Sequence, residues 1–388
     1  MNFLYLSPHF PPNFSLFCKR LSEQGVKVLG IGDSPQENLE SELKNSLFDY
    51  YQVPNLENSE AVYRGCAYFI WKHGRIDRVE SHIEHWLGLE AELREDFNIF
   101  GPKKAQTEAF RRKSSMKKIF RQINVPVADG VLFQDETQLR EFVKKVGFPL
   151  VAKPDIGVGA WATYMIKNEK DIVDFLISHP PVDYFLEEFI SGKLYTFDGI
   201  TNSKGEMVLY TSHHSDTGVW ELVNENLDLS YYSLREIPDQ LFEYGKNIVA
   251  AFKLPEKFFH IEFFKLFKND VFTVIEINCR PPGGFTTDMM NFTADVDVYR
   301  LWAEIVAHGR THTRFDRKYH CAHVARKNGK DYVYSHEEIL ARYGDKIVVH
   351  TEVPEVFSAV MGNYTYLVRT PIESQIREMI SEIQKVRG

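Results

Sequence analysis

The feature that most constrains the fold of this chain is a pair of β-rich segments separated by three residues. The segments "FHIEFFKLF" and "VFTVIEIN" are rich in aromatic and β-branched residues, and "KND" lies between them. This pattern predicts a hairpin, because such residues favour strands and a short polar stretch favours a turn. Since loop length sets the register of a hairpin, a three-residue loop pairs Glu262 with Glu276.

The predicted register places two acids on one face of the hairpin. Directly opposed residues have Cβ atoms about 5 Å apart, and Asn278 shares the face of Glu276 because strand side chains alternate. Like charges this close destabilise a sheet unless something neutralises them. Mg²⁺ accepts a few carboxylate oxygens and keeps positions for phosphate oxygens, so Glu262, Glu276 and Asn278 are candidate metal ligands. The alternatives are an edge hairpin whose acids face water, and a two-residue loop that would pair Glu262 with Ile277.

Candidate phosphate ligands lie upstream of the hairpin. In "FPLVAKPDIGVGA", Lys153 ends an apolar strand just before a loop that contains Gly157 and Gly159. Glycines let backbone N–H groups approach phosphate oxygens, and lysine supplies a compact charge. Lys113, in the basic run "RRKSSMKK", is a second candidate, although a surface lysine is its ordinary interpretation.

A third segment, "YFLEEFISGKLYTFDGI", begins as an apolar strand and turns acidic at Glu187 and Glu188. Such a strand could meet an adenine with one side chain and backbone groups in a hydrophobic slot. A strand end whose acids face solvent fits the composition equally well.

Composition bounds the class of protein. A chain of 388 residues is longer than one hydrophobic core usually organises, which favours more than one domain. A net charge of −8 argues against a general nucleic-acid binder. The four cysteines have no disulfide or zinc spacing, and no apolar run is long enough to cross a bilayer. The N-terminus has no signal-peptide pattern, so we expect a cytoplasmic protein without nucleic-acid or membrane partners.

The order of the segments predicts three domains. The strand at 2–7, the helix at 14–25 and the strand at 26–32 suggest a parallel βαβ unit. We expect domains at 1–103, 104–310 and 311–388, the last running from a strand near 319–326 to a closing helix at 372–386.

Taken together, the segments resemble the ATP-grasp superfamily, and "HIEF…VIEIN.R" is the specific element of that resemblance. It covers roughly residues 100 to 310. The resemblance implies a multidomain fold of α/β and α+β parts: an N-terminal parallel α/β (pre-ATP-grasp) domain, the ATP-grasp domain and a small C-terminal subdomain. The expected cofactors are ATP and Mg²⁺, with Mn²⁺ as a possible substitute.

Residue by residue, the resemblance assigns Lys113 and Lys153 to the ATP phosphates, under the loop with Gly157 and Gly159. It assigns the adenine to Glu187 and to the main chain of Glu188 and Ile190, and Mg²⁺ to Glu262, Glu276 and Asn278. Arg280 would stabilise the transferring phosphoryl group and an acyl-phosphate intermediate. One position departs from the pattern, because many relatives hold the ribose with a glutamate where this chain has Leu194.

These assignments imply an ATP-dependent carboxylate–amine ligase, similar to the L-amino acid ligase branch, which forms a C–N bond and releases ADP and phosphate. Gly283 and Gly284 could let a substrate carboxylate approach Arg280, and His214 is a candidate substrate residue. A carboxylase-like enzyme that activates bicarbonate and a non-catalytic nucleotide-binding module are the alternatives, and a homodimer is possible.

Overall fold

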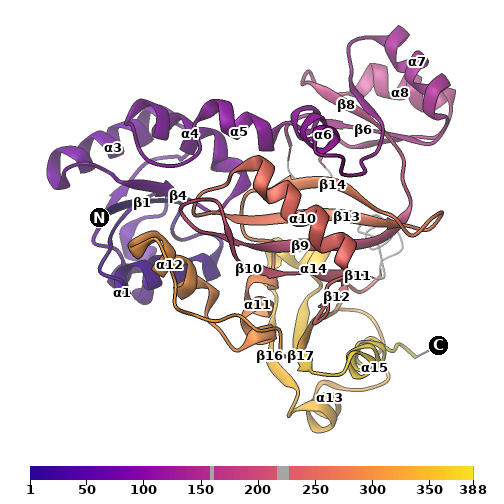
Figure 1. The fold of residues 1–388 in the computed structure, drawn as a ribbon. Helices are drawn as coiled ribbons and strands as arrows, with labels where there is room; N and C mark the ends of the chain where they lie inside the picture. The colour runs from indigo at the N-terminus through magenta and orange to yellow at the C-terminus, as the bar shows by residue number, and fades with distance from the viewer. Residues whose placement is uncertain (158–160, 216–226, 388) are drawn as a thin grey trace.

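The computed structural model describes residues 1–157, 161–215 and 227–387 (Figure 1). Its N-terminal part is a parallel sheet in the order β3-β2-β1-β4. The strands are β1 (Asn2–Leu6), β2 (Lys27–Gly32), β3 (Asp49–Gln52) and β4 (Arg78–Glu80). The helices are α1 (Ser15–Glu23), α2 (Ser41–Ser46), α3 (Ser59–His73) and α4 (Leu87–Asp96), with 3-10 turns η1 (Pro12–Phe14), η2 (Gln36–Asn38) and η3 (Glu84–Trp86).

Both faces of this sheet are apolar, as burial on two sides requires. Phe3 and Tyr5 of β1 lie in the core shared with α1, whereas Leu4 and Leu6 lie in the core shared with α3. The predicted parallel βαβ unit is therefore confirmed.

A small antiparallel sheet lies at the upper right of Figure 1, in the order β5-β8-β6-β7. Its strands are β5 (Gly130–Leu132), β6 (Leu150–Pro154), β7 (Tyr164–Ile166) and β8 (Tyr184–Glu188). Two helices, α7 (Glu136–Val146) and α8 (Glu169–Ser178), pack on it through one apolar cluster. This sheet carries Lys153 and Glu187 on neighbouring strands.

A large sheet forms the centre of the molecule, in the order β14-β13-β9-β11-β12-β15-β17-β16, with β10 paired to β9. The strands from the middle of the chain are β9 (Gly192–Thr201), β10 (Met207–Thr211), β11 (His213–Ser215), β12 (Ser230–Ser233), β13 (Phe258–Leu266) and β14 (Phe272–Asn278). The strands from its last segment are β15 (His320–Arg326), β16 (Ile347–Glu352) and β17 (Tyr364–Thr370). The last segment thus extends the large sheet instead of forming a sheet of its own.

Helix α10 (Asp239–Phe252) covers one face of the large sheet. Its apolar residues recur at helical spacing, and a Cβ on Gly245 would come within 2.2 Å of the Phe197 ring, so glycine permits the close approach. The remaining helices are α5 (Lys104–Arg111), α6 (Lys113–Gln122), α11 (Thr286–Ala294), α12 (Val298–His308), α13 (His336–Tyr343), α14 (Glu355–Met361) and α15 (Glu373–Ile383). No described helix combines the length and apolar character that a membrane crossing needs.

The hairpin β13–β14 has the predicted pairing of two acids, but its register near the turn differs from the prediction. Glu262 lies opposite Glu276, as expected. Near the turn, however, Lys265 pairs with Phe272, one step out of the predicted register, and a bulge beyond Phe263 takes up the extra residue. The predicted three-residue loop was therefore wrong, and the bulge restores the pairing of the two acids.

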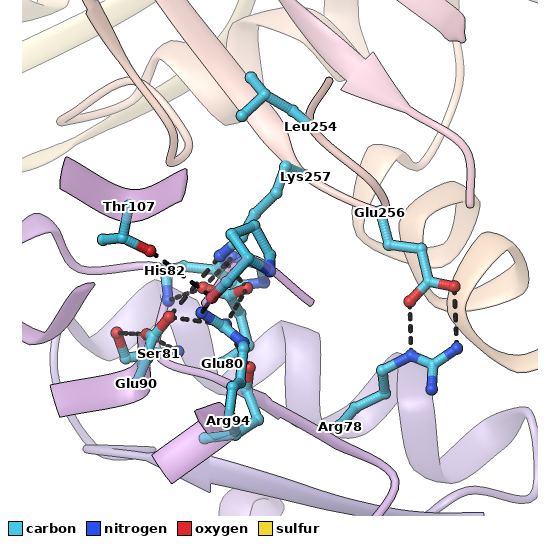
Figure 2. Close-up of polar contacts among 12 residues, drawn as sticks. Arg78, Glu80, Ser81, His82, Glu90, Arg94, Thr107, Leu254, Glu256 and Lys257 are labelled. Carbon is cyan, nitrogen blue, oxygen red and sulfur yellow. Dashed lines mark hydrogen bonds and ion pairs between the residues drawn. The ribbon is translucent and has the colours of Figure 1, made fainter. Parts of the chain in front are cut away.

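The N-terminal part and the large sheet meet at buried ion pairs, shown in Figure 2. Lys257, just before β13, contacts Glu80 at the end of β4. Glu90 and Arg94 of α4 complete the cluster, with 2.9 Å between their Oε2 and Nη2 atoms. Arg78 binds both oxygens of Glu256, at 2.7 and 3.1 Å. Since a buried charge is costly without a partner, these contacts fix how the two parts meet.

Candidate active site

Two carboxylates and an amide gather at the β13–β14 hairpin. Glu262 and Glu276 are opposed, and Asn278 donates from Nδ2 to Oε1 of Glu276 at 3.2 Å. Burial disfavours the charge of Glu276, but Lys113 and Lys153 lower its pKa below the usual value. The acid therefore stays ionised beside the two lysines that the sequence assigned to phosphates.

A second cluster joins the small sheet to α6. Oε2 of Glu187 lies 2.5 Å from Nζ of Lys153, and its Oε1 contacts Lys117. Burial alone would raise the pKa of Glu187, but the two lysines lower it to about 2. Burial lowers the pKa of Lys117 to about 8, and the charge of Lys153 adds to this shift, whereas Glu187 opposes it. The cluster thus holds more positive than negative charge.

Lys113 begins α6 and lies next to the predicted phosphate loop. Its Nζ donates to the carbonyl of Gly157 at 3.3 Å, and its backbone N–H donates to the carbonyl of Asp155 at 2.9 Å. Asp155 is fully buried and accepts from the backbone N–H of Ser114 at 2.8 Å. Gly159 lies outside the described residues.

Arg280 follows the hairpin and binds an acid from the N-terminal part of the chain. Its Nε and Nη2 atoms lie 3.1 and 3.0 Å from Oε2 of Glu84 in η3. Burial raises the pKa of Glu84, and Arg280 opposes that shift. Sequence reasoning missed this contact, because no local pattern relates residues 196 positions apart.

Sequence reasoning also missed Lys117 and His260, although each had a local signal. Lys117 lies four residues after Lys113, so both share one face of α6. His260 lies two residues before Glu262, so both share one face of β13.

His260 connects Glu262 to a buried acid. Its Nε2 lies 3.2 Å from Oε1 of Glu262, and its Nδ1 lies 2.5 Å from Oδ1 of Asp198 on β9. Asp198 also binds Nδ1 of His213 at 2.8 Å. Burial would lower the pKa of His260, but Asp198 raises it to about 10. Because carboxylates only accept hydrogen bonds, His260 donates through both ring nitrogens.

His214, the candidate substrate residue, lies on the opposite face of the large sheet from Glu262. His214 stacks on Tyr195, with 4.3 Å between ring centroids, and its Nδ1 lies 3.0 Å from the carbonyl of Leu194. Strand alternation puts its neighbour His213, and not His214, on the side of Asp198 and Glu262.

The other predicted positions lie on or next to the expected elements. Glu188 ends β8, where its N–H donates to the carbonyl of Asp129 at 2.8 Å, and Ile190 follows in the connection to β9. Gly283 and Gly284 lie between Arg280 and α11. Gly284 has φ +63°, and a Cβ there would meet the Met361 side chain at 2.2 Å, so the conformation favours glycine.

The donor set fits a hard divalent cation held together with phosphates. Glu262, Glu276 and Asn278 supply the oxygen ligands that Mg²⁺ prefers, and the side chain of Glu262 is 29% exposed, so it can be reached. No group of three His, Cys, Asp or Glu side chains that could hold a metal unaided occurs in the described part of the chain. A cation here would take its remaining ligands from water or from a bound nucleotide.

Comparisons with known sequences give distant relatives. No protein-family model matches the chain. The carbamoyl phosphate synthase large chain of Clostridium acetobutylicum is 21% identical over 204 residues, which are 50% of this chain and 18% of that protein. The corresponding protein of Caldanaerobacter subterraneus subsp. tengcongensis is 20% identical over 302 residues, which are 74% of this chain and 26% of that protein. The chain therefore spans well under a third of these curated relatives.

Solved structures match along nearly the whole chain. The L-amino acid ligase of Bacillus licheniformis has a TM-score of 0.72 at 15% identity, covering 100% of this chain and 98% of that one. N5-carboxyaminoimidazole ribonucleotide synthetase of Thermotoga maritima has a TM-score of 0.71 at 16% identity, covering 99% of both chains. Phosphoribosylglycinamide synthetase of Anaerococcus prevotii has a TM-score of 0.69 at 14% identity, covering 100% of this chain and 98% of that one. The predicted fold class is thus confirmed: the chain has the ATP-grasp fold of these structures.

Proposed function

We propose that the chain is an ATP-dependent ligase that phosphorylates a small-molecule carboxylate and joins the resulting acyl phosphate to an amine. The observation that carries this proposal is the proximity of surplus lysine charge to an opposed pair of carboxylates. Lys113 and Lys153 together lower the pKa of Glu276, and Lys117 and Lys153 share Glu187. A triphosphate would pair with the lysines, and a divalent cation bound to it would pair with the opposed carboxylates.

The basic residues would bind phosphate groups, and the acidic and amide residues would bind the metal ion. Lys113, Lys117 and Lys153 would bind phosphate oxygens as compact cations. Glu262, Glu276 and Asn278 would hold Mg²⁺, which when bound neutralises phosphate charge. Arg280, held by Glu84, would face the transferring phosphoryl group.

The chemistry follows from the absence of a good leaving group on a carboxylate. Its leaving group is oxide, so an amine cannot displace it. Transfer of the γ-phosphoryl group to a carboxylate oxygen breaks the bond to ADP and creates a phosphate leaving group. The amine nitrogen then attacks the acyl carbon, phosphate departs and the nitrogen loses a proton. Positioning and charge neutralisation account for catalysis of this kind, so no nucleophilic side chain is needed.

The test is ADP and phosphate release from MgATP, with a panel of amino acids and small acids, followed by mass spectrometry of products. We expect release that requires both a carboxylate and an amine. Lys153→Met and Arg280→Met should lower the release rate at least about a hundredfold, whereas Lys144→Met, at an exposed lysine on α7, should leave it unchanged. Background hydrolysis with every pair would contradict the ligase, and nucleotide binding without turnover would favour a non-catalytic module.

A carboxylase-like reaction is the second candidate. Among the matching structures, the biotin carboxylase domain of Hydrogenobacter thermophilus 2-oxoglutarate carboxylase was solved with MgADP and bicarbonate, and it has a TM-score of 0.68 at 16% identity. Bicarbonate is itself a carboxylate, and the same lysines and Arg280 would serve its phosphorylation. ATP turnover that bicarbonate alone stimulates would favour this reaction. The homodimer and the cytoplasmic location stay predictions.

A further inference from the structure

A hollow of about 520 Å³ lies between the N-terminal part of the chain and the large sheet. The charged residues that line this hollow are Arg75, Lys103, Lys204 and Lys253. We call the hollow the basic groove. None of its lining residues belongs to the candidate active site. Four cations around one hollow are notable in a chain whose net charge is −8.

The nearby acids Glu206, Glu95 and Asp77 accept hydrogen bonds from groups other than the four cations of the basic groove. Glu206 accepts from Nδ2 of Asn202 at 2.8 Å, Glu95 accepts from the backbone N–H of Lys104 at 3.2 Å, and Asp77 accepts from the backbone N–H of Asn2 at 2.8 Å. Within the described ranges, neither Lys204 nor Lys253 forms an ion pair with an acidic side chain within 4.0 Å.

The cations of Arg75 and Lys103 also lack acidic partners among the described residues. Arg75 donates from Nη2 to the carbonyl of Asn98 at 3.1 Å, and Lys103 donates from Nζ to Oδ1 of Asn98 at 3.5 Å. Both acceptors are neutral. The groove therefore keeps a concentration of uncompensated positive charge, which favours an anion.

The remaining lining suits a small phosphorylated ligand. Lys103 and Gln106 come from the start of α5, and the N-terminus of a helix adds a partial positive charge that favours phosphate. Phe100 and Pro255 supply apolar surface. The volume falls in the range of about 300–1,000 Å³ that small-molecule sites occupy. A nucleic acid is disfavoured, because the rest of the chain carries net negative charge.

The basic groove lies next to the ion pairs of Figure 2, which join the N-terminal part to the large sheet. Pro255 lines the groove, and the next two residues, Glu256 and Lys257, bind Arg78 and Glu80 of the N-terminal part. Lys204 and Lys253 come from the large-sheet side, whereas Arg75 and Lys103 come from the other side. A ligand that binds all four would therefore bridge the two parts of the molecule.

We infer that the basic groove is a binding site for a small molecule with more than one phosphate group, separate from the candidate active site. The probe for this inference is inorganic pyrophosphate, titrated by calorimetry into the full chain. Because pyrophosphate could also meet the active-site lysines, the titration is repeated with Lys153→Met. This variant keeps the basic groove but lacks one of the three lysines proposed to bind phosphate, so the test does not require an active ligase.

The decisive variant is Lys204→Glu with Lys253→Glu, both of which are exposed side chains. Each substitution replaces a cation that could bind phosphate with an anion that repels it, so we expect affinity to fall at least about tenfold. The matched control is Lys144→Glu with Lys170→Glu, which makes the same change in net charge on α7 and α8. Binding should survive in that control and weaken with added salt.

Three results would overturn the inference. The first is no heat of binding to the wild-type chain or to Lys153→Met. The second is equal affinity in the Lys204→Glu/Lys253→Glu variant and the wild type. The third is an equal loss in the Lys144→Glu/Lys170→Glu control, which would show a general effect of net charge.

Discussion

Arg280 and Glu84 form an ion pair that joins the end of the hairpin to the N-terminal part of the molecule. Nη2 of Arg280 lies 3.0 Å from Oε2 of Glu84, and the two side chains are 20% and 19% exposed. The arginine assigned to the phosphoryl group therefore depends on a residue from another part of the chain. Glu84 in turn follows the segment Glu80–His82 that binds Lys257 and Glu90.

This pairing predicts that Arg280 and Glu84 act as a unit. Arg280→Met should lower the rate of ADP release by about 10²–10³, the usual cost of losing one charge-stabilising donor. Glu84→Gln should lower the rate less, because a neutral acceptor remains. The two effects should not add in the double variant, since contacting residues show coupling of about 0.5–3 kcal/mol. Simple addition of the two losses would contradict the proposed unit.

Glu187→Gln should destabilise the fold. The variant leaves Lys117 and Lys153 buried without their shared acid, and breaking a buried pair costs about 3–5 kcal/mol. The pKa of Glu187 is about 2 in the folded chain against an ordinary 4.5, so the stability that it contributes is complete above 4.5 and is lost as pH falls toward 2.

The measurement is urea unfolding of wild type and Glu187→Gln across that pH range. The difference in free energy of unfolding should be largest near neutral pH and shrink in acid. Glu188→Gln, at the neighbouring position on β8, is the control. A difference that does not change with pH would exclude an ionised Glu187 as its source.

Glu276→Gln should weaken divalent-cation binding without unfolding the hairpin. The variant keeps an oxygen ligand and a similar shape but removes one of two opposed charges. We expect the Mn²⁺ affinity, read by electron paramagnetic resonance in the presence of ADP, to fall by about tenfold or more. Unchanged Mn²⁺ binding in both Glu276→Gln and Glu262→Gln would remove the metal site from the proposal.

His260 should act as a positioning residue for Glu262. Partners that orient a metal ligand typically contribute about 10–100-fold to metal affinity, so His260→Gln should weaken Mn²⁺ binding within that range. The rate should recover at high Mg²⁺ concentration, because the ligand itself remains. His214→Gln replaces a buried histidine on the opposite side of the sheet and is the matched control. The role fails if both variants bind Mn²⁺ like the wild type.

The hairpin shows how far local pattern reaches. Aromatic and β-branched residues predicted both strands, because strand preference is a local property. The pairing of Glu262 with Glu276 was predicted from a three-residue loop, whereas the structure reaches the same pairing through a bulge. The bulge beyond Phe263 was not predictable. The extra residue is Ile275 of β14, which has no partner on β13, whereas β13 keeps a single register with β9 along its length.

The sequence by itself determined the parallel start of the chain, the hairpin and the residue types at the candidate site, since each depends on spacing within a few residues. Only the tertiary structure decided which charges meet. In the folded chain, Lys117 contacts Glu187 and Arg280 pairs with Glu84. His213, and not His214, contacts Asp198. The partners in each pair lie at least 15 positions apart along the chain, and the energy of a buried charge depends on its neighbours in space.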